Sequence, residues 1–391
     1  MALCLLNGNE AAAEAVRLAR VEVIPGYPIT PESPLIEKVN QFIAGGRLDG
    51  TFIRVESDHS ALAAAVGAAL VGSRTFTGTN SQGLALMSEV VHHTAGLRLP
   101  VVMAVVNRAL SAPHSRFPDH GDAIAQESAG WLQLYCENNQ EVLDTIIQAF
   151  RIAEDERVRL PVMVNYEAYI QTHTSEPVHV PEQVVVDEFL PLRRRPVLDV
   201  DHPAAVNLPT DHQYYTEFKE QQHGAMLASA AVIREVALEF FHRFGRDWKG
   251  TTEQYRCEDA EFVMVTMGSM VSTAREAVDR MRAAGRRIGL LKVRSFRPFP
   301  EDEITAVAAG RRGLVVIDRN LVYGVGGALA REVKAALYGV ASAPHIYAFV
   351  AGLGGRDVTV DDMEYMVSQV MASGRERKGM TAFDFYGLKT S

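Results

Sequence analysis

Three short segments carry the residues best suited to chemistry, and each follows or ends a predicted β-strand. They are Gly26-Tyr27-Pro28-Ile29-Thr30-Pro31, Val55-Glu56-Ser57-Asp58-His59-Ser60, and Ala104-Val105-Val106-Asn107-Arg108. In an α/β sheet, ligands bind at the carboxyl ends of the strands. Each segment therefore lies where a hydroxyl, a carboxylate or a guanidinium group can meet a bound molecule.

Each of these side chains also has a structural interpretation. Thr30 can cap the next helix instead of binding a substrate. Glu56 and Asp58 can be a cap with solvated charges, or one of them can be a catalytic carboxylate held in a poorly solvated place. Arg108 is costly to bury unless it meets an anion, and a bound carboxylate or an internal salt bridge explains it equally well.

The loop after Arg108 is the predicted cover of the site. Its sequence, Ala112-Pro113-His114-Ser115-Arg116-Phe117-Pro118-Asp119-His120, is rich in turn-forming and polar residues, and such loops can close over a bound ligand.

Two α/β domains are predicted to position these residues, because 391 residues exceed the roughly 250–300 at which one core stops growing. Short β-branched runs predict a buried parallel sheet with strands at Val21–Ile24, Phe52–Val55, Thr75–Thr77, Val101–Val106 and Val162–Asn165. A helix is predicted from Asn139 to Glu156. Its apolar face carries Leu143, Ile146, Ile147 and Phe150, and its other face is charged.

The middle of the chain breaks this alternation. Prolines from 177 to 209 predict an extended crossing segment from Ser175 to His212, in which Arg193-Arg194-Arg195 forms a solvated or subunit-facing patch. A long helix is predicted from about Gly224 to Phe244. The alternation then resumes with strands at Phe262–Val265, Ile288–Val293, Leu314–Ile317 and Ile346–Val350 and a helix near Ser272–Ala284. The predicted division is 1–174, 175–258 and 259–391.

Composition excludes several classes of function. A net charge of −9 is typical of a soluble acidic protein and not of one that binds nucleic acid or a membrane surface. Cys4, Cys136 and Cys257 lack the spacing of a zinc or iron–sulfur site, so no metal ligands are predicted. The stretch from Ala61 to Gly72 is shorter than the ~20 residues of a membrane helix and suits a buried one. With no secretion signal recognised, a cytoplasmic location is expected.

Several segments, in order, resemble the α subunit of pyruvate:ferredoxin oxidoreductases and their 2-oxoacid relatives. They are Asn7-Gly8-Asn9-Glu10-Ala11, Tyr27-Pro28-Ile29-Thr30-Pro31, Glu56-Ser57-Asp58-His59-Ser60-Ala61, Ser81-Gln82-Gly83-Leu84-Ala85-Leu86-Met87, Asn107-Arg108-Ala109-Leu110-Ser111, Val265-Thr266-Met267-Gly268-Ser269, Leu291-Lys292-Val293-Arg294 with Phe296-Arg297-Pro298-Phe299-Pro300, and Val316-Ile317-Asp318-Arg319-Asn320. The resemblance implies a pyrimidine-type thiamine-diphosphate domain followed by a smaller transketolase C-terminal-like α/β domain.

The resemblance also implies roles for individual residues. Thr30 would bond the substrate's oxygens, Arg108 would bind its carboxylate, and an acidic residue would activate the aminopyrimidine ring of the cofactor. The glutamate usual in the family aligns with Asp58, one methylene shorter, so Asp58 is slightly favoured over Glu56. Further residues of the matching segments and the loop are expected around the bound molecules: Ile29, Ser81 and Gln82 beside the cofactor, and Tyr27, His114 and Phe117 beside the substrate.

By the same resemblance, the site is shared with a β subunit. That partner would bind the diphosphate, Mg²⁺ and a [4Fe–4S] cluster, and γ and δ subunits would complete the complex. The activity implied is oxidative decarboxylation of a 2-oxoacid to acyl-CoA and CO₂, with CoA as co-substrate and ferredoxin or another acceptor taking the electrons. This chain agrees with the division, since it has no Gly-Asp-Gly start of a diphosphate motif and no cluster cysteines.

The substrate and two rival functions stay open. His114 to Phe117 replace a more apolar, Trp-containing stretch expected of pyruvate enzymes, so an aryl acid such as phenylglyoxylate, stacking on Phe117, competes with pyruvate. A transketolase or 2-oxoacid dehydrogenase E1-type subunit shares the domain plan. A non-catalytic scaffold subunit is the third possibility, because Asp58 stands at a glutamate position.

Overall fold

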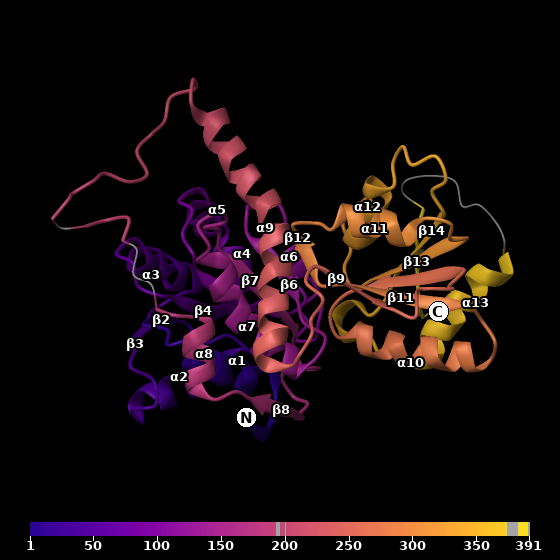
Figure 1. The fold of residues 1–391 in the computed structure, drawn as a ribbon, viewed down its shortest axis with the longest axis horizontal. Coiled ribbons are helices and arrows are strands. Elements are labelled where there is room, and N and C mark those ends of the chain that lie inside the picture. Colours follow the sequence, from indigo (N-terminus) through magenta and orange to yellow (C-terminus); the bar gives the residue numbers. More distant parts are fainter. Residues whose placement is uncertain (193–195, 200, 374–381, 390–391) are drawn as a thin grey trace.

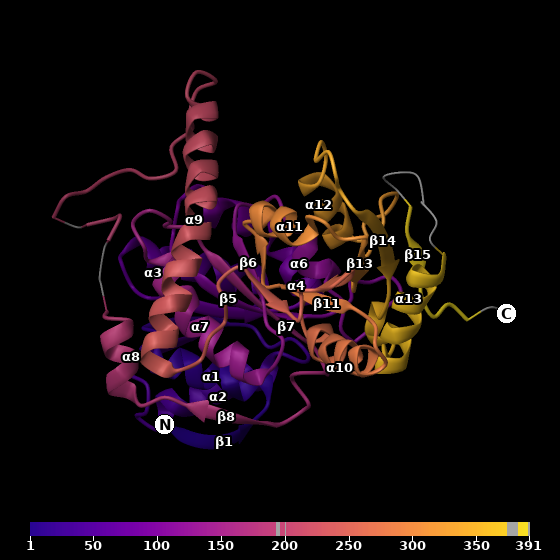
Figure 2. The same ribbon diagram turned by 45° about the vertical axis from the view of Figure 1, so that its right-hand side comes forward.

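Two α/β lobes lie side by side, with one long helix running along the first (Figures 1 and 2). The computed structural model describes residues 1–192, 196–199, 201–373 and 382–389. The predicted patch at Arg193-Arg194-Arg195 lies outside the described residues. Within them, no helix combines the length and apolarity needed to cross a bilayer.

The first lobe is built on a five-stranded sheet. Its order is β12 (Ser295–Arg297), β6 (Leu132–Tyr135), β7 (Val162–Glu167), β5 (Val102–Asn107) and β4 (Phe76–Thr79). All neighbours are parallel except β12, which pairs antiparallel with β6. A parallel bridge from Val23 to Thr75 places the pair β2 (Val23–Gly26) and β3 (Thr51–Arg54) next to β4. The carboxyl ends of β2, β3, β4, β5 and β7 thus share one edge.

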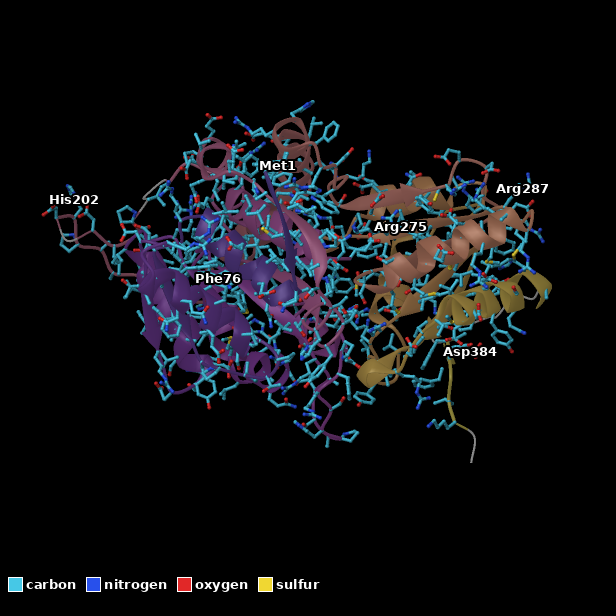
Figure 3. The ribbon with its side chains drawn as sticks, turned by 90° about the horizontal axis from the view of Figure 1, so that it is seen from below. Met1, Phe76, His202, Arg275, Arg287 and Asp384 are labelled. Carbon is cyan, nitrogen blue, oxygen red and sulfur yellow. The ribbon has the colours of Figure 1, made fainter. Side chains whose placement is uncertain are left out.

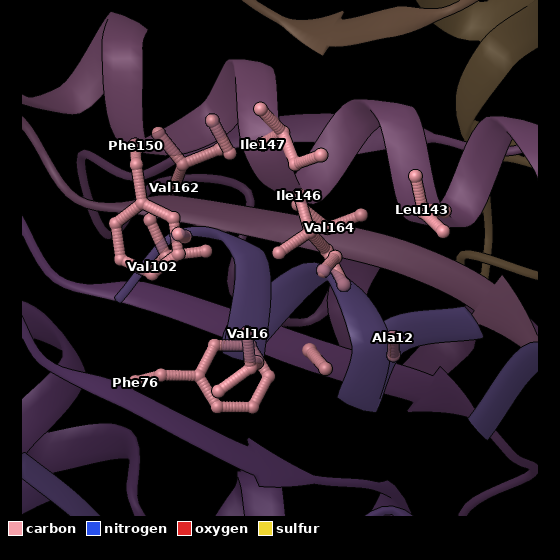
Figure 4. Close-up of a cluster of buried hydrophobic side chains, with 14 of the residues drawn as sticks. Ala12, Val16, Phe76, Val102, Leu143, Ile146, Ile147, Phe150, Val162 and Val164 are labelled. Atoms are coloured by element: carbon pink, nitrogen blue, oxygen red, sulfur yellow. The ribbon is translucent and has the colours of Figure 1, made fainter. Parts of the chain in front are cut away.

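Helices cover both faces of this sheet because its strands are apolar on both sides, as every residue of β5 is buried. They are α1 (Gly8–Leu18), α2 (Ser33–Ala44), α3 (Asp58–Leu70), α4 (Ser81–Leu86), α5 (Ser88–Gly96), α6 (Gly121–Ile124) and α7 (Asn139–Ala153). On one face, Val16 of α1 and Phe150 of α7 pack with Phe76, Val102 and Val162 of the sheet (Figure 4). This core fixes the strands that end at the site.

One helix is more fully buried than its pattern indicates, and the prediction for another needs correction. The apolar face of α7 is fully buried as predicted, but its charged face is buried as well. Glu141 accepts from Lys292 at 2.7 Å and Asp144 pairs with Arg246 at 2.5 Å, so residues from later in the chain cover this face. The helix predicted to be buried from Ala61 onward, α3, is buried on one face only, and Ala63 and Gly67 are exposed.

The crossing segment is more regular than predicted. It contains β8 (Glu176–Val180), which pairs antiparallel with β1 (Ala2–Leu6), and helix α8 (Gln183–Phe189). The long helix, α9 (Tyr215–Phe244), begins earlier than the predicted Gly224. It ends where predicted, because Gly245 adopts the left-handed conformation that closes a helix (φ 72°).

The second lobe has a six-stranded sheet. Its order is β15 (Asp384–Phe385), β14 (His345–Val350), β13 (Gly313–Asp318), β10 (Phe262–Thr266), β11 (Ile288–Val293) and β9 (Thr252–Tyr255). Its helices are α10 (Met270–Ala283), α11 (Glu301–Ala308), α12 (Ala328–Ala336) and α13 (Val360–Ser373), with a 3₁₀ turn, η1, at Leu353–Gly355. Each strand predicted in this part is confirmed to within a residue at either end.

Buried ion pairs join the two lobes. Arg275 of α10, which lies on the side of the second lobe facing the first (Figure 3), pairs with Glu137 at 2.9 Å, and Lys292 pairs with the same carboxylate at 3.0 Å. At the end of β7, Glu167 accepts from the Ser269 hydroxyl at 2.6 Å and from Arg319 at 2.8 Å. The second lobe therefore docks against the edge of the first sheet near the carboxyl ends of its strands.

Candidate active site

Four predicted site residues meet at the carboxyl edge of the first sheet. Thr30 follows β2, Asp58 opens α3 after β3, Ser81 opens α4 after β4, and Arg108 follows β5. Hydrogen bonds tie the segments together: Arg108 donates to the Gln82 side chain at 2.6 Å and to the backbone carbonyl of Thr30. The sheet order therefore brings together side chains that lie far apart in the sequence.

Arg108 is buried, with 6% of its surface exposed. Its bonds are made to neutral oxygens, and among the described residues it forms no ion pair and its Nε has no hydrogen-bond partner. Burial lowers the pKa of this guanidinium, while the nearby Asp122, Tyr169 and Asp58 oppose that shift. The internal salt bridge considered from the sequence is absent from the described chain, and the arrangement suits an incoming carboxylate.

Asp122, a residue not singled out by the sequence, holds this region in place. Its carboxylate accepts from the backbone amide of Arg108 at 3.0 Å, the amide of Ser81 at 2.9 Å and the Asn107 side chain at 2.9 Å. Burial raises its pKa to about 6, although these bonds oppose the rise. Asp122 thus positions both Arg108 and Ser81.

Asp58 is buried at the start of α3, with 4% of its surface exposed. Its Oδ1 accepts from the Thr79 hydroxyl at 2.7 Å, and the backbone amide of Asp58 itself also bonds the carboxylate. Burial raises the pKa of this carboxyl, and the Thr79 bond and the Arg108 charge oppose the rise. A Cβ on Gly83 would lie 2.5 Å from Oδ1, so only glycine permits this close approach.

Glu56 has a different environment. It is exposed and accepts a hydrogen bond from the Ser60 hydroxyl, which lowers its pKa. The cap of α3 is Ser57, whose hydroxyl accepts from the Ser60 amide at 3.2 Å. Of the two acidic residues, Glu56 is the solvated charge and Asp58 is the buried one.

A third carboxylate, Glu32, was missed although it follows the Thr30-Pro31 motif directly. It is fully buried, and neither oxygen receives a hydrogen bond of normal geometry in the described structure. Burial and the charge of Asp58 raise its pKa well above the ordinary value, and the Ile29 amide opposes this only in part. A Cβ on Gly78 would lie 2.3 Å from its Oε1, so it rests against β4.

The residues predicted to surround the substrate lie at the surface of this edge. Thr30 and Tyr27 are exposed and Ile29 is partly buried. The cap interpretation of Thr30 is wrong, because Glu32 occupies the N-cap position of α2 and no side chain caps the helix. His114 is exposed, with its Nδ1 3.3 Å from the Ser111 hydroxyl. Phe117 is also exposed, with 45% of its surface accessible.

The Phe117 ring belongs to an aromatic group whose other members, Tyr169 and His173, lie more than 50 residues further along the chain. Its centroid lies 5.0 Å from that of Tyr169, which stacks on His173 at 4.3 Å. Ala109 donates to the Phe117 carbonyl at 3.1 Å, so the loop folds back beside Arg108.

Comparison with known proteins identifies the family. The family described as "Pyruvate flavodoxin/ferredoxin oxidoreductase, thiamine diP-bdg" matches residues 14–238, and "Pyruvate:ferredoxin oxidoreductase core domain II" matches residues 260–363. Pyruvate synthase subunit PorA of Methanothermobacter thermautotrophicus is 46% identical over 94% of this chain and 95% of its own length. Ketoisovalerate oxidoreductase subunit VorA of Pyrococcus abyssi is 45% identical over 95% and 95%. This chain is a 2-oxoacid:ferredoxin oxidoreductase α subunit.

Solved structures support the fold of this oxidoreductase subunit. A 2-oxoglutarate:ferredoxin oxidoreductase from Magnetococcus marinus matches with a TM-score of 0.71 at 17% identity, over 94% of this chain and 65% of that chain. A split-gene transketolase matches with a TM-score of 0.57 at 14% identity. The predicted fold class is confirmed, and the family match decides against the transketolase and dehydrogenase alternatives.

The oxidoreductase site fits the pyrimidine side of thiamine diphosphate. An aminopyrimidine ring offers nitrogen donors and acceptors, and the edge holds buried polar atoms without partners in the described structure: Gln82 Nε2, Asn80 Oδ1 and both oxygens of Glu32. Asp58 adds a buried carboxylate to this edge. Among the described residues, no group of His, Cys, Asp and Glu side chains is arranged to hold a metal.

Proposed function

We propose that this α subunit decarboxylates a 2-oxoacid oxidatively, as part of a complex, to give an acyl-CoA and CO₂. The observation that carries the proposal is the buried Asp58 carboxylate, fixed by Thr79 and set near an Arg108 that has no ion pair among the described residues. Thiamine diphosphate, when bound, supplies a carbon nucleophile that attacks the substrate's keto group. The protein's own part is to orient the reactants and control protons.

In this proposal Asp58 bonds a pyrimidine nitrogen of the cofactor and holds the shared proton, for which a raised pKa is favourable. Arg108 binds the substrate carboxylate, and the exposed Thr30 hydroxyl donates to its keto oxygen. Ile29, Ser81 and Gln82 lie beside the cofactor, and Tyr27, His114 and Phe117 lie on the substrate side. Glu56 is not assigned a role, because an exposed and readily ionised carboxylate cannot retain a proton at neutral pH.

The remaining parts of the machinery are assigned to partners. We assign the diphosphate, Mg²⁺ and a [4Fe–4S] cluster to a β subunit, with γ and δ subunits and ferredoxin or another acceptor completing electron transfer in the cytoplasm. The cysteines support this, because Cys4, Cys136 and Cys257 lack the spacing of a cluster motif and no metal-holding group of side chains occurs in the described part of the chain. We also propose that the chain divides into three parts, residues 1–174, 175–258 and 259–391.

The substrate is proposed to be pyruvate or a larger apolar 2-oxoacid, with phenylglyoxylate as the aryl example. The relatives named for pyruvate and for ketoisovalerate are 46% and 45% identical, so overall similarity does not choose between them. The exposed ring of Phe117 favours the larger acids.

The test measures acyl-CoA formation by the co-purified complex with a dye acceptor. We expect Asp58→Asn to lower kcat by at least ~10²-fold, because general acid–base groups contribute roughly that much. The matched control, Glu56→Gln, removes the neighbouring exposed carboxylate and should change kcat little. Equal and small effects of both substitutions would favour the scaffold interpretation, and turnover by the α subunit alone would contradict the proposal.

A further inference from the structure

Three aromatic rings form a continuous wall beside Arg108, and we call Phe117, Tyr169 and His173 the aromatic wall. Phe117 and Tyr169 meet at 51° with centroids 5.0 Å apart, and Tyr169 and His173 are stacked at 8° and 4.3 Å. The backbone places the wall: Phe117 bonds to Ala109, and Tyr169 follows Ala168, which bonds to Asn107. Backbone hydrogen bonds to Asn107 and Ala109, the two neighbours of Arg108 in sequence, therefore hold the wall beside Arg108.

Tyr169 is held in an unfavourable backbone conformation. Its φ is 62°, in the left-handed region that is unfavourable for a residue with a side chain. The Thr172 hydroxyl accepts from the Tyr169 amide at 2.8 Å and lies 2.8 Å from His173 Nδ1, so a single hydroxyl organises both rings. Strain of this kind persists where the surroundings over-determine the conformation, and it clusters at binding sites.

The second lobe braces the other end of the wall. A Cβ on Gly355, in the turn after β14, would lie 2.3 Å from the Cβ of Phe117 and 3.0 Å from its Cγ. The φ of Gly355 is 79°, so glycine is required there for space and for conformation. Phe117 is thus confined between Tyr169 and the backbone of the second lobe.

We propose that Tyr169 is a specificity-determining residue and that the aromatic wall selects 2-oxoacids with a bulky apolar side chain, branched or aryl, over pyruvate. The inference rests on the proposed function and deepens it. With its carboxylate on Arg108, a substrate turns its third carbon away from the anchor, and a branched or aryl group there can reach an aromatic face. The methyl group of pyruvate is too short to gain much from the wall.

The expected size of the preference follows from apolar recognition. A single additional methylene in a fitted pocket changes kcat/KM by about 10–200-fold. The side chains of the wall also lose little conformational entropy when a substrate binds, since the Tyr169 and His173 rings are already stacked. Removing the central ring should therefore affect bulky substrates strongly and pyruvate weakly.

The experiment compares kcat/KM of the intact complex for pyruvate, 3-methyl-2-oxobutanoate, phenylglyoxylate and 2-oxoglutarate. We expect the wild type to prefer a bulky apolar acid. Tyr169→Ala should lower the ratio of bulky substrate to pyruvate by about 10–100-fold, and Tyr169→Phe should keep it near the wild-type value. Tyr169→Gly also removes the ring. Because glycine readily adopts the left-handed backbone conformation, this variant should fold even if Tyr169→Ala does not. Tyr338→Ala, which removes a tyrosine that is 87% exposed elsewhere, is the control.

Gly355→Ala tests the brace from the second lobe. The added methyl group should displace Phe117 and lower the same ratio, while the affinity for thiamine diphosphate, titrated by protein fluorescence, stays unchanged. A uniform loss of all substrates, or no change in the ratio, overturns the inference while the proposed function stands. A wild-type preference for 2-oxoglutarate or pyruvate also overturns it. A complex that turns over none of the four acids contradicts the proposed function itself.

Discussion

At the scale of residues, two buried carboxylates flank strand β4 and differ in how they are held. Thr79 and Gly78 are consecutive in β4 and face opposite sides of the sheet. Asp58 is bonded to Thr79, whereas Glu32 lies against Gly78 without a normal hydrogen bond among the described residues. Burial and the charge of Asp58 raise the pKa of Glu32 well above its ordinary value, and burial raises the pKa of Asp58 as well, against the Thr79 bond and the Arg108 charge.

Replacing Glu32 by glutamine should give a protein whose stability advantage over the wild type grows as pH rises. Unfolded Glu32 loses its proton near pH ~4.3, whereas folded Glu32 keeps it to much higher pH. Between those two pKa values the unfolded state binds fewer protons, so the wild-type protein loses about 1.4 kcal/mol per pH unit. Denaturant unfolding at pH 4 to 8 measures this. A difference between the two proteins that does not grow with pH would show that Glu32 is ionised in the fold.

The sequence predicted that the candidate site residues lie near one another, because each follows a strand of the predicted parallel sheet. Thr30, Asp58 and Arg108 each follow such a strand, and parallel strands place their ends on one edge. Glu32 and Asp122 were missed, since a single acidic residue in a loop or at a helix start usually contacts solvent. Their burial depends on which segments fold over them, and no local pattern encodes that.

At the scale of elements, the site depends on how closely α4 approaches α3. Helix α4 begins at Ser81, two residues after β4 ends at Thr79, and a Cβ on Gly83 in its first turn would lie 2.5 Å from the Asp58 carboxylate. A side chain at position 83 would occupy the space of Asp58 Oδ1 and of the Thr79 hydroxyl. Glycine is required at position 83 because α3 and α4 approach closely, and not because of a turn.

Gly83→Ala should displace the Asp58 carboxylate and lower kcat by about 10²-fold, because a shift near 1 Å of a catalytic group costs roughly that much. The matched control is Gly67→Ala in α3, where an added Cβ meets no atom within 4 Å. That control should keep full activity and gain up to ~1 kcal/mol of stability from the better helix former. Retained activity in Gly83→Ala would mean that Asp58 tolerates displacement and is not the activating group.

The predicted elements were accurate where one signal dominated. Continuous β-branched runs predicted β5, β10, β11 and β13 nearly to the residue. The strands β6 and β9 have the sequences LQLY and TEQY, which are four residues long and contain no continuous β-branched run to recognise. Both lie next to partners from other parts of the chain, and pairing compensates for their weak propensity.

At the scale of the whole molecule, buried charges lock the lobes together. Glu141 is fully buried and pairs with Lys292 at 2.7 Å and with Arg294 at 3.1 Å. Burial alone would raise the pKa of Glu137, but the hydrogen bonds and charges of Arg275 and Lys292 lower it to about 2. The stability that Glu137 contributes is therefore present at neutral pH and is lost as pH falls from ~4.3 toward 2.

Glu141→Gln should destabilise the protein by about 3–5 kcal/mol, because it leaves buried cations without full compensation. The control is Asp361→Asn, which breaks an exposed pair with Arg280 and should cost no more than ~1 kcal/mol. Thermal unfolding measures both, and limited proteolysis reports whether the lobes separate first. Equal destabilisation by the two substitutions would mean that the buried network adds nothing to lobe docking.

The sequence by itself determined the family, the two α/β lobes and the strand ends that carry Thr30, Asp58 and Arg108, because these rest on local patterns and on motifs that survive in order. The tertiary structure decided which acidic residue is buried, which glycine a carboxylate requires, and which rings meet beside Arg108. Those properties arise between segments distant in sequence, as when Gly355 of the second lobe confines Phe117 of the first. The burial of a residue and its close contacts depend on which distant segments pack against it, and only the folded chain decides which segments meet.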